Sequence, residues 1–223
     1  MYLLLSIAVI PPILIIYYII KSDIFPEPTH LIVKTFILGA LICLPAGQIN
    51  YYLIVLPEVN IERDLAFLAG FTEEPFKFLV LYFFIKPKKD FDEPMDAIVY
   101  GVLISLGFAA FENIDYVLSG ESANESIIIG IVRAFTAIPM HGSCGVIMGY
   151  YFGMHVFKGE RLALYKSLII PIFFHATYNF FAGSSILLMI VTLYFLISFA
   201  LRLHKKLILE QESKRFEAER RVS

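Results

Sequence analysis

Long apolar segments are the feature of this sequence that most limits its fold. A helix needs about 20 mainly apolar residues to cross the hydrocarbon of a bilayer. About seven segments meet that condition, at 2–20, 31–55, 65–85, 96–118, 137–157, 165–182 and 184–203. The 223-residue chain is 58% hydrophobic and only 17% charged, well below the charged share of a soluble domain. We therefore expect an all-α polytopic membrane bundle in residues 1–203, followed by a charged tail in residues 204–223.

One region does not divide cleanly into spans. Residues 126–157 are too long for a single upright span, and Arg133 and Pro139 interrupt them. If residues 127–136 form a separate interfacial helix, the bundle has eight helices and the next span begins near Pro139.

The positions of lysine and arginine in the connections predict the orientation. Basic residues gather in the first, third and fifth connections, at Lys21, 86–89 and 158–161, and again in the tail. The connections between them are mainly acidic, although one contains Arg63. Because basic loops stay on the cytoplasmic side, we expect a multi-pass protein of the cell membrane with its N-terminus outside and its tail in the cytoplasm.

The charge balance excludes nucleic acid as a partner. The chain has 18 Lys and Arg against 20 Asp and Glu, which leaves no basic excess to neutralise phosphates. Both cysteines, Cys43 and Cys144, lie inside apolar segments, so a disulfide framework is not expected.

Ionisable side chains inside the apolar segments mark a candidate site, because each costs free energy in lipid. They come from four segments and are accompanied by one amide: Glu73, Glu74, Lys77, Glu112, Asp115, His141, His175 and Asn179. At a rise of 1.5 Å per residue, Glu73, Glu112 and His175 lie about 9 to 12 Å from the outer ends of their helices. Taken singly, each is compatible with a packing or salt-bridge role. Their similar depth predicts one cluster in the outer half of the membrane.

Spacing along the helices adds geometry to this cluster. His175 and Asn179 are four residues apart and share one helix face, as do Glu73 and Lys77. Lys77 would then compensate the charge of one glutamate and leave the other free. Glu112 faces Tyr116 in the same way, so we expect Lys77, Glu112 and Tyr116 to support the site.

Two carboxylates, two imidazoles and an amide are the groups needed to hydrolyse an amide bond. In one version Glu73 is the base, Glu74 its partner and His141 the group that orients water, while His175 and Asn179 donate hydrogen bonds to the oxyanion. In another, Glu73, His141 and His175 bind zinc and leave a position open for water. The residues alone leave both versions open.

Four motifs in register carry a family resemblance. They are Glu73-Glu74-Pro75-Phe76-Lys77, the Phe111–Tyr116 segment, Pro139-Met140-His141-Gly142 and His175-Ala176-Thr177-Tyr178-Asn179, together with an early Glu27-Pro28 and a segment from Asp96 to Gly101. In order and spacing they resemble the PrsW family of intramembrane proteases. That family resembles the wider superfamily of CAAX prenyl proteases, whose motifs map onto Glu73 and Glu74, onto His141, and onto His175 and Asn179. The superfamily has an arginine four residues after the second glutamate, whereas this chain has Lys77 three residues after it.

The resemblance implies an activity and a partner. PrsW proteins make the site-1 cut in a membrane-spanning anti-sigma factor on its extracytoplasmic side. By that likeness we expect a peptidase whose partners are the lipid bilayer and a single-span, anti-sigma-factor-like substrate.

Other classes of function remain compatible with the residues. A proton- or cation-coupled transporter or channel would also place buried glutamate and histidine among seven spans, although no internal repeat supports it. A non-catalytic protein that binds transmembrane helices is a further alternative. Within the hydrolases, Gly142-Ser143-Cys144-Gly145 distantly resembles the rhomboid nucleophile loop, with the serine one position early.

Overall fold

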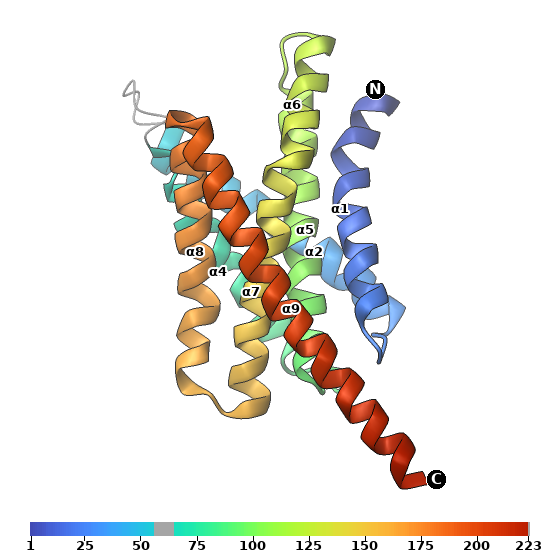
Figure 1. Cartoon of the computed structure of the whole chain (residues 1–223). Coiled ribbons are helices and arrows are strands. Elements are labelled where there is room, and N and C mark those ends of the chain that lie inside the picture. The colour runs from blue at the N-terminus through green and yellow to red at the C-terminus, as the bar shows by residue number, and fades with distance from the viewer. Residues whose placement is uncertain (56–64, 223) are drawn as a thin grey trace.

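The computed structural model describes residues 1–55 and 65–222, and within these ranges the chain is helical with no strand. The helices are α1 (Tyr2–Ser22), α2 (Thr29–Asn50), α4 (Leu68–Val80), α5 (Pro94–Leu118), α6 (Ala123–Phe135), α7 (Ala137–Lys158), α8 (Arg161–Ser184) and α9 (Ile186–Val222), with π-helical turns η1 (Tyr51–Val55) and η2 (Leu81–Ile85). The all-α membrane bundle expected from the sequence is confirmed (Figure 1). The connection with Arg63, used above to predict orientation, lies outside the described residues.

Several helices of the bundle are long and apolar enough to cross a membrane. Among the described residues five segments meet this condition: α1, α2 with the first residues of η1, α5, α6 with α7, and most of α9. Helices α4 and α8 are not among the five but pack against each other in the same bundle. With them, the number of segments agrees with the seven expected from the sequence.

Helix α5 forms the centre of the bundle (Figure 1). Every residue from Pro94 to Ala110 is buried, as expected for a helix that is apolar on all sides. Helices α1, α2 and α7 pack around it. The N-terminus of α5 carries a capping box between Glu93 and Asp96, which fixes where the helix begins.

Glycines bring the backbones of the central helices into direct contact. A Cβ atom at Gly149 of α7 would collide with the carbonyl oxygen of Ala97 in α5, and one at Gly107 of α5 would collide with that of Phe36 in α2. Small residues are the usual means of close helix packing in membranes. The tight α5–α7 contact places the polar residues of α7 beside those of α5.

A break at Thr136 separates α6 from α7. Pro139 has no N–H to bond to the carbonyl of Phe135, the last residue of α6. The separate helix expected near 127–136 is therefore present, although it begins earlier, at Ala123. It packs against α1 and α5 and runs in line with α7 (Figure 1). Its location at the membrane interface stays a prediction.

The charged tail continues α9 without a break. The helix passes residue 204 unchanged, and His204, Leu207 and Gln211 are buried against the bundle. Residues 212–220 are exposed. The division between the bundle and the tail at residue 204 stays a prediction, but the first two turns of that tail contact the other helices.

Candidate active site

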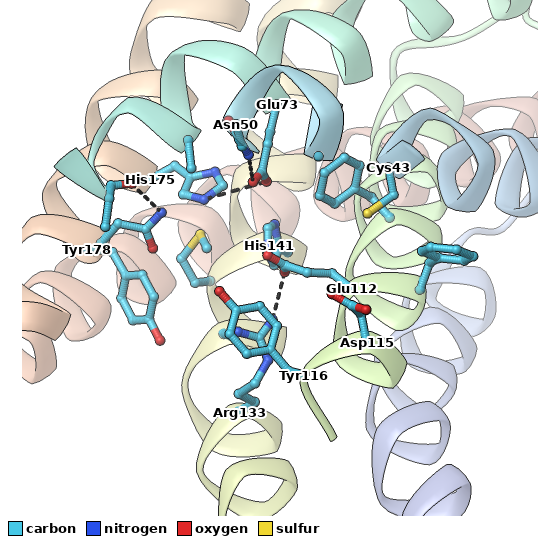
Figure 2. A pocket seen from close by; sticks show the side chains of 18 of the residues that line it. Cys43, Asn50, Glu73, Glu112, Asp115, Tyr116, Arg133, His141, His175 and Tyr178 are labelled. Carbon is cyan, nitrogen blue, oxygen red and sulfur yellow. Dashed lines mark hydrogen bonds and ion pairs between the residues drawn. The ribbon is translucent and has the colours of Figure 1, made fainter. Parts of the chain in front are cut away.

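A cavity of about 830 Å³ lies among α2, α4, α5, α6, α7 and α8 (Figure 2). The lining includes seven of the residues that the sequence predicted for the site: Glu73, Glu112, Asp115, Tyr116, His141, His175 and Asn179. Glu74 and Lys77 do not line the cavity. They lie behind it and are fully buried. The fold thus brings the predicted residues of α4, α5, α7 and α8 together in two layers, one lining the cavity and one supporting it.

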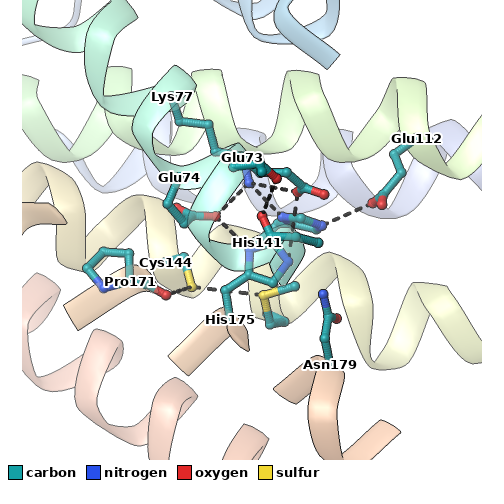
Figure 3. Close-up of polar contacts among 12 residues, drawn as sticks. Glu73, Glu74, Lys77, Glu112, His141, Cys144, Pro171, His175 and Asn179 are labelled. Carbon is teal, nitrogen blue, oxygen red and sulfur yellow. Dashed lines mark hydrogen bonds and ion pairs between the residues drawn. The ribbon is translucent and has the colours of Figure 1, made fainter. Parts of the chain in front are cut away.

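The adjacent glutamates Glu73 and Glu74 have different surroundings (Figure 3). Glu74 Oε1 lies 2.8 Å from Nδ1 of His175 and 2.7 Å from Nζ of Lys77. Glu73 Oε1 accepts a hydrogen bond of 3.2 Å from the Asn50 amide. Glu73 Oε2 is buried and has no hydrogen-bond partner, although Lys77 Nζ is 3.6 Å away. Glu74 Oε2 is likewise buried without a hydrogen-bond partner. The difference is that Glu74 is held through Oε1 by two close partners behind the cavity, whereas Glu73 lines the cavity.

Close packing of α4 on α8 puts these groups within reach of each other. A Cβ at Gly70 would lie only 2.7 Å from the backbone nitrogen of Ala176, so the two backbones touch there. Gly70 precedes Glu73 by about one helical turn, and Ala176 follows His175 directly. The contact therefore sets His175 against the glutamates of α4.

The contact with Glu74 defines the tautomer of His175. A carboxylate only accepts hydrogen bonds, so Nδ1 of His175 carries the proton and donates it. Nε2 then has a free lone pair and lies 3.8 Å from Glu73 Oε2. A neutral His175 consequently offers an acceptor or a metal ligand at this atom. The oxyanion-donor role expected from the sequence would require a second proton on the ring.

His141 is held at both ring nitrogens. Its Nδ1 lies 3.0 Å from Lys77 Nζ, and its Nε2 lies 3.1 Å from Glu112 Oε2. The ammonium of Lys77 only donates, so Nδ1 accepts and Nε2–H donates to Glu112. The His141 and His175 rings stand edge to face, with their centroids 4.9 Å apart. To bind a metal, His141 must give up one of its two contacts.

Sequence reasoning missed the role of Arg133 in this network. Its Nη2 lies 2.7 Å from Glu112 Oε2, and its Nε donates to Asn113 at 2.6 Å. The guanidinium also stacks 3.8 Å from the centroid of the Tyr116 ring. The sequence does carry a signal, because Arg133 is an isolated charge in an apolar segment, but the same pattern also predicts an interruption of a span.

Two amides complete the polar lining. Asn179 lines the cavity and donates through Nδ2 to the carbonyl of Ala66 at 3.2 Å, which leaves its second amide hydrogen for another acceptor. Asn50, which holds Glu73, was also missed. It stands at the end of an apolar segment, where a polar residue carries no distinguishing signal.

The residues fit a metal ion by geometry and by charge. Glu73, His141 and His175 each offer a ligand atom, and these atoms lie within 4.8 Å of one another. The unpaired Glu73 Oε2 and the free Nε2 of His175 are suitable donors, and two histidines with one carboxylate are a common zinc set. Among the described residues, the lysine and arginine side chains paired with Glu73, Glu74 and Glu112 are Lys77 and Arg133, so these three carboxylates outnumber their cations by one.

A helical membrane bundle that encloses a glutamate–histidine cavity has the features of an intramembrane hydrolase. Residues 27–202 match the model of a family described as PrsW family intramembrane metalloprotease. This chain belongs to the PrsW family. A protein named Protease PrsW from Geobacillus kaustophilus (strain HTA426) is 37% identical over 183 residues, covering 80% of this chain and 79% of that protein. Another Protease PrsW, from Bacillus subtilis (strain 168), is 33% identical over 217 residues, covering 92% of this chain and 96% of that protein. No solved structure matches the chain.

Family membership confirms the prediction of a membrane-embedded peptidase and favours it over the transporter and the helix-binding protein. The family description as a metalloprotease agrees with the metal-binding geometry of Glu73, His141 and His175. Ser143 does not line the main cavity. It borders a separate cavity of about 200 Å³ beside Ile15 and His204.

Proposed function

We propose that this chain is an intramembrane endopeptidase that cleaves a single-span membrane protein by attack of water in the 830 Å³ cavity. The observation that carries the proposal is the free Oε2 of Glu73, buried at the cavity beside the lone pair of His175 Nε2. A desolvated carboxylate oxygen without a donor is suited to accept a proton or to hold a metal. Among the described residues that line the cavity, no other side chain has a buried oxygen without a hydrogen-bond partner beside a free histidine nitrogen.

The remaining residues hold this pair in place. Glu74 fixes the ring of His175, and Lys77 neutralises Glu74 while it donates to His141. The spare amide hydrogen of Asn179 would donate to the oxyanion that forms on the scissile carbonyl. Without a metal, Glu73 Oε2 takes the proton of the attacking water and passes it to the leaving amine, as a general base and acid.

Zinc is the metal that the donor set suits best. The family description names a metalloprotease without naming the metal. Glu73, His141 and His175 would hold it, and it would polarise the attacking water. In this version Oε2 of Glu73 is a ligand rather than a base. The two versions therefore differ in whether the purified protein needs a metal.

The position of the cavity supports cleavage near the extracytoplasmic side. The lining comes from the end of α2, the start of α4 and the ends of α5 and α8, which meet at one end of the bundle. The basic connections at 86–89 and 158–161 lie at the other ends of α4, α5, α7 and α8. With basic loops inside, the cavity faces outward, which is where a site-1 cut in an anti-sigma-factor-like substrate would fall.

Proteolysis by the purified protein tests the proposal. Single-span reporter proteins with different sequences at the outer membrane boundary are incubated with the protein in proteoliposomes, and the fragments are sequenced. We expect cuts at the outer boundary that disappear with Glu73→Ala. Cleavage that persists in Glu73→Ala, or ion flux without any cleavage by the wild type, would overturn the proposal.

A further inference from the structure

A second group of acidic side chains lies at the other end of α5. Asp23 and Glu27 belong to the connection between α1 and α2, and Asp96 belongs to the first turn of α5. Asp96 precedes Glu112 by 16 residues, or about 24 Å along the helix. The Glu27-Pro28 pair and the segment beginning at Asp96 have no part in the proposed peptidase site.

The three carboxylates converge on a small volume. One oxygen of each lies within 4.8 Å of the others. The side chains are largely buried, since Asp23 is 8%, Glu27 9% and Asp96 1% exposed. They come from segments far apart in the sequence, so the fold rather than chain proximity assembles them.

Neutral donors of the protein hold one oxygen of each carboxylate. Asp23 Oδ1 accepts from the Phe25 N–H at 3.1 Å and from Gln211 Nε2 at 2.7 Å. The Tyr100 hydroxyl donates to Glu27 Oε2. Two backbone N–H groups, from Asp92 and Glu93, each donate to Asp96 Oδ2 at 2.8 Å. These bonds orient the carboxylates but contribute no full positive charge.

A positive charge is what this cluster lacks. At the peptidase site every buried glutamate faces Lys77 or Arg133, whereas no ion pair joins Asp23, Glu27 or Asp96 to a described lysine, arginine or histidine. Lys214 pairs with Glu93 at 3.5 Å rather than with one of the three acids. Buried carboxylates without a cation are costly.

One oxygen of the cluster has no hydrogen-bond partner. Asp23 Oδ2 is buried and has no hydrogen-bond partner, although the other oxygen of the same carboxylate has two. A buried acceptor without a donor is rare in a folded protein. A cation between the three carboxylates would bind this oxygen and would also supply the missing positive charge.

We propose that Asp23, Glu27 and Asp96 form a binding site for a hard divalent cation, Mg²⁺ or Ca²⁺, separate from the peptidase centre. The ligands are oxygen only, which is the preference of these ions and differs from the nitrogen-rich set of the peptidase site. Two oxygens on one Ca²⁺ lie at most about 5 Å apart, given bonds of about 2.3 to 2.6 Å. The separation of 4.8 Å or less satisfies that limit. Mg²⁺, with bonds of about 2.0 to 2.1 Å, would need the oxygens within about 4.2 Å of one another.

The cation would link three parts of the bundle. It would tie the α1–α2 connection to the first turn of α5, and through Gln211, which bonds to Asp23 and to Glu93, it would also fix the buried part of α9. We therefore expect the ion to stabilise the fold rather than take part in the cleavage reaction. Because the measurements below detect binding and stability, this inference and the proposed peptidase function fail independently.

Thermal unfolding of the full-length protein in detergent tests the site. The protein is first freed of divalent ions with a chelator and then titrated separately with Mg²⁺ and with Ca²⁺, up to about 10 mM, above the Kd of weak sites of this kind. We expect a rise in Tm of several degrees for at least one ion, since a ligand that binds only the folded state stabilises it. No rise with either ion would overturn the inference.

Matched variants separate this site from general ion effects. Asp23→Asn keeps the shape of the side chain and removes its charge, so the affinity should fall about 10-fold or more. Asp90→Asn makes the same change at an exposed aspartate of the connection that precedes α5, and it should respond as the wild type does. An equal response in Asp23→Asn and the wild type would contradict the proposal.

Terbium luminescence provides a second measurement that does not depend on stability. Tb³⁺ replaces Ca²⁺ at oxygen sites and emits when a nearby tyrosine is excited, and this chain has no tryptophan. Tyr100, bonded to Glu27, is placed to sensitise it. We expect emission that Ca²⁺ or Mg²⁺ competes away and that Asp23→Asn and Tyr100→Phe both weaken. Emission unchanged in both variants would place the ion elsewhere.

Discussion

Glu74 holds His175 through a contact of 2.8 Å between Oε1 and Nδ1, and this contact turns the opposite ring nitrogen toward Glu73. Consecutive residues in a helix point about 100° apart, so the Glu73-Glu74 pair supplies one carboxylate to the cavity and one to the layer behind it. A carboxylate bonded to a histidine that faces a reactive centre is a common means of fixing the tautomer and direction of the ring. The two glutamates therefore have separable roles.

Exchanging each glutamate for glutamine should distinguish these roles. Glu73→Gln removes the free carboxylate oxygen of the cavity, so we expect activity to fall at least about 100-fold. Tm should stay unchanged, because Lys77 still forms its ion pair with Glu74. Glu74→Gln leaves the fully buried Lys77 without its closest anion and should lower both Tm and activity. Reporter cleavage and thermal unfolding in detergent measure the two effects. Equal loss of Tm in both variants would contradict the distinction.

The buried pair of Lys77 and Glu74 should show strong coupling. Lys77→Met keeps the length of the side chain but leaves two buried carboxylates unpaired, and breaking such a pair typically costs about 3 to 5 kcal/mol. The double variant Lys77→Met, Glu74→Gln should be more stable than the sum of the single effects indicates. Free energies of unfolding for the four proteins give the coupling, and additive values would exclude a direct interaction.

Removal of metal tests the zinc version of the mechanism. Purified protein should contain about one zinc per chain, and a strong chelator should abolish cleavage that added zinc restores. Glu73→Gln and His175→Ala should lower the metal content, whereas His30→Ala, at an exposed histidine, should not. Full activity in metal-free protein would leave Glu73 as a base that acts without a metal.

Arg133 is expected to act on the reaction through Glu112 and His141. Arg133→Ala removes the contact of 2.7 Å that holds Glu112, so His141 loses a fixed partner and kcat should fall about 10- to 100-fold. KM should change less, because Arg133 acts through another residue. Arg161→Ala, at an exposed arginine that begins α8, is the matched control. A fall in stability without a change in kcat would reduce Arg133 to a structural role.

Glycine packing gives a prediction that thermal unfolding tests without measuring activity. Gly149→Ala places a Cβ against the carbonyl oxygen of Ala97, and overpacking of this kind costs about 1 to 3 kcal/mol. Gly47→Ala meets nothing within 4 Å and should gain up to about 1 kcal/mol from helix propensity. Opposite shifts of Tm in the two variants would support the α5–α7 contact, and a gain in both would contradict it.

The sequence pattern predicted much of the fold and many of the residues of the candidate site. Segment lengths and hydropathy indicated the helical bundle, and the cost of charges in lipid singled out Glu73, Glu112, His141 and His175. The same reasoning misjudged Arg133, because a single charge between two apolar runs is as compatible with a break as with a buried ion pair. The extent of the tail was also hidden, since the near-helical spacing of its charges does not show that Gln211 contacts Asp23.

The sequence by itself determined that the chain is a bundle of membrane helices and which polar side chains must be buried in it, because both follow from the free energy of placing groups in lipid. Only the tertiary structure decided the partners of those side chains. Helical spacing relates residues of one helix, whereas the pairing of Glu74 with His175, and the oxygen left free on Glu73, depend on how closely α4 packs against α8 at Gly70 and Ala176.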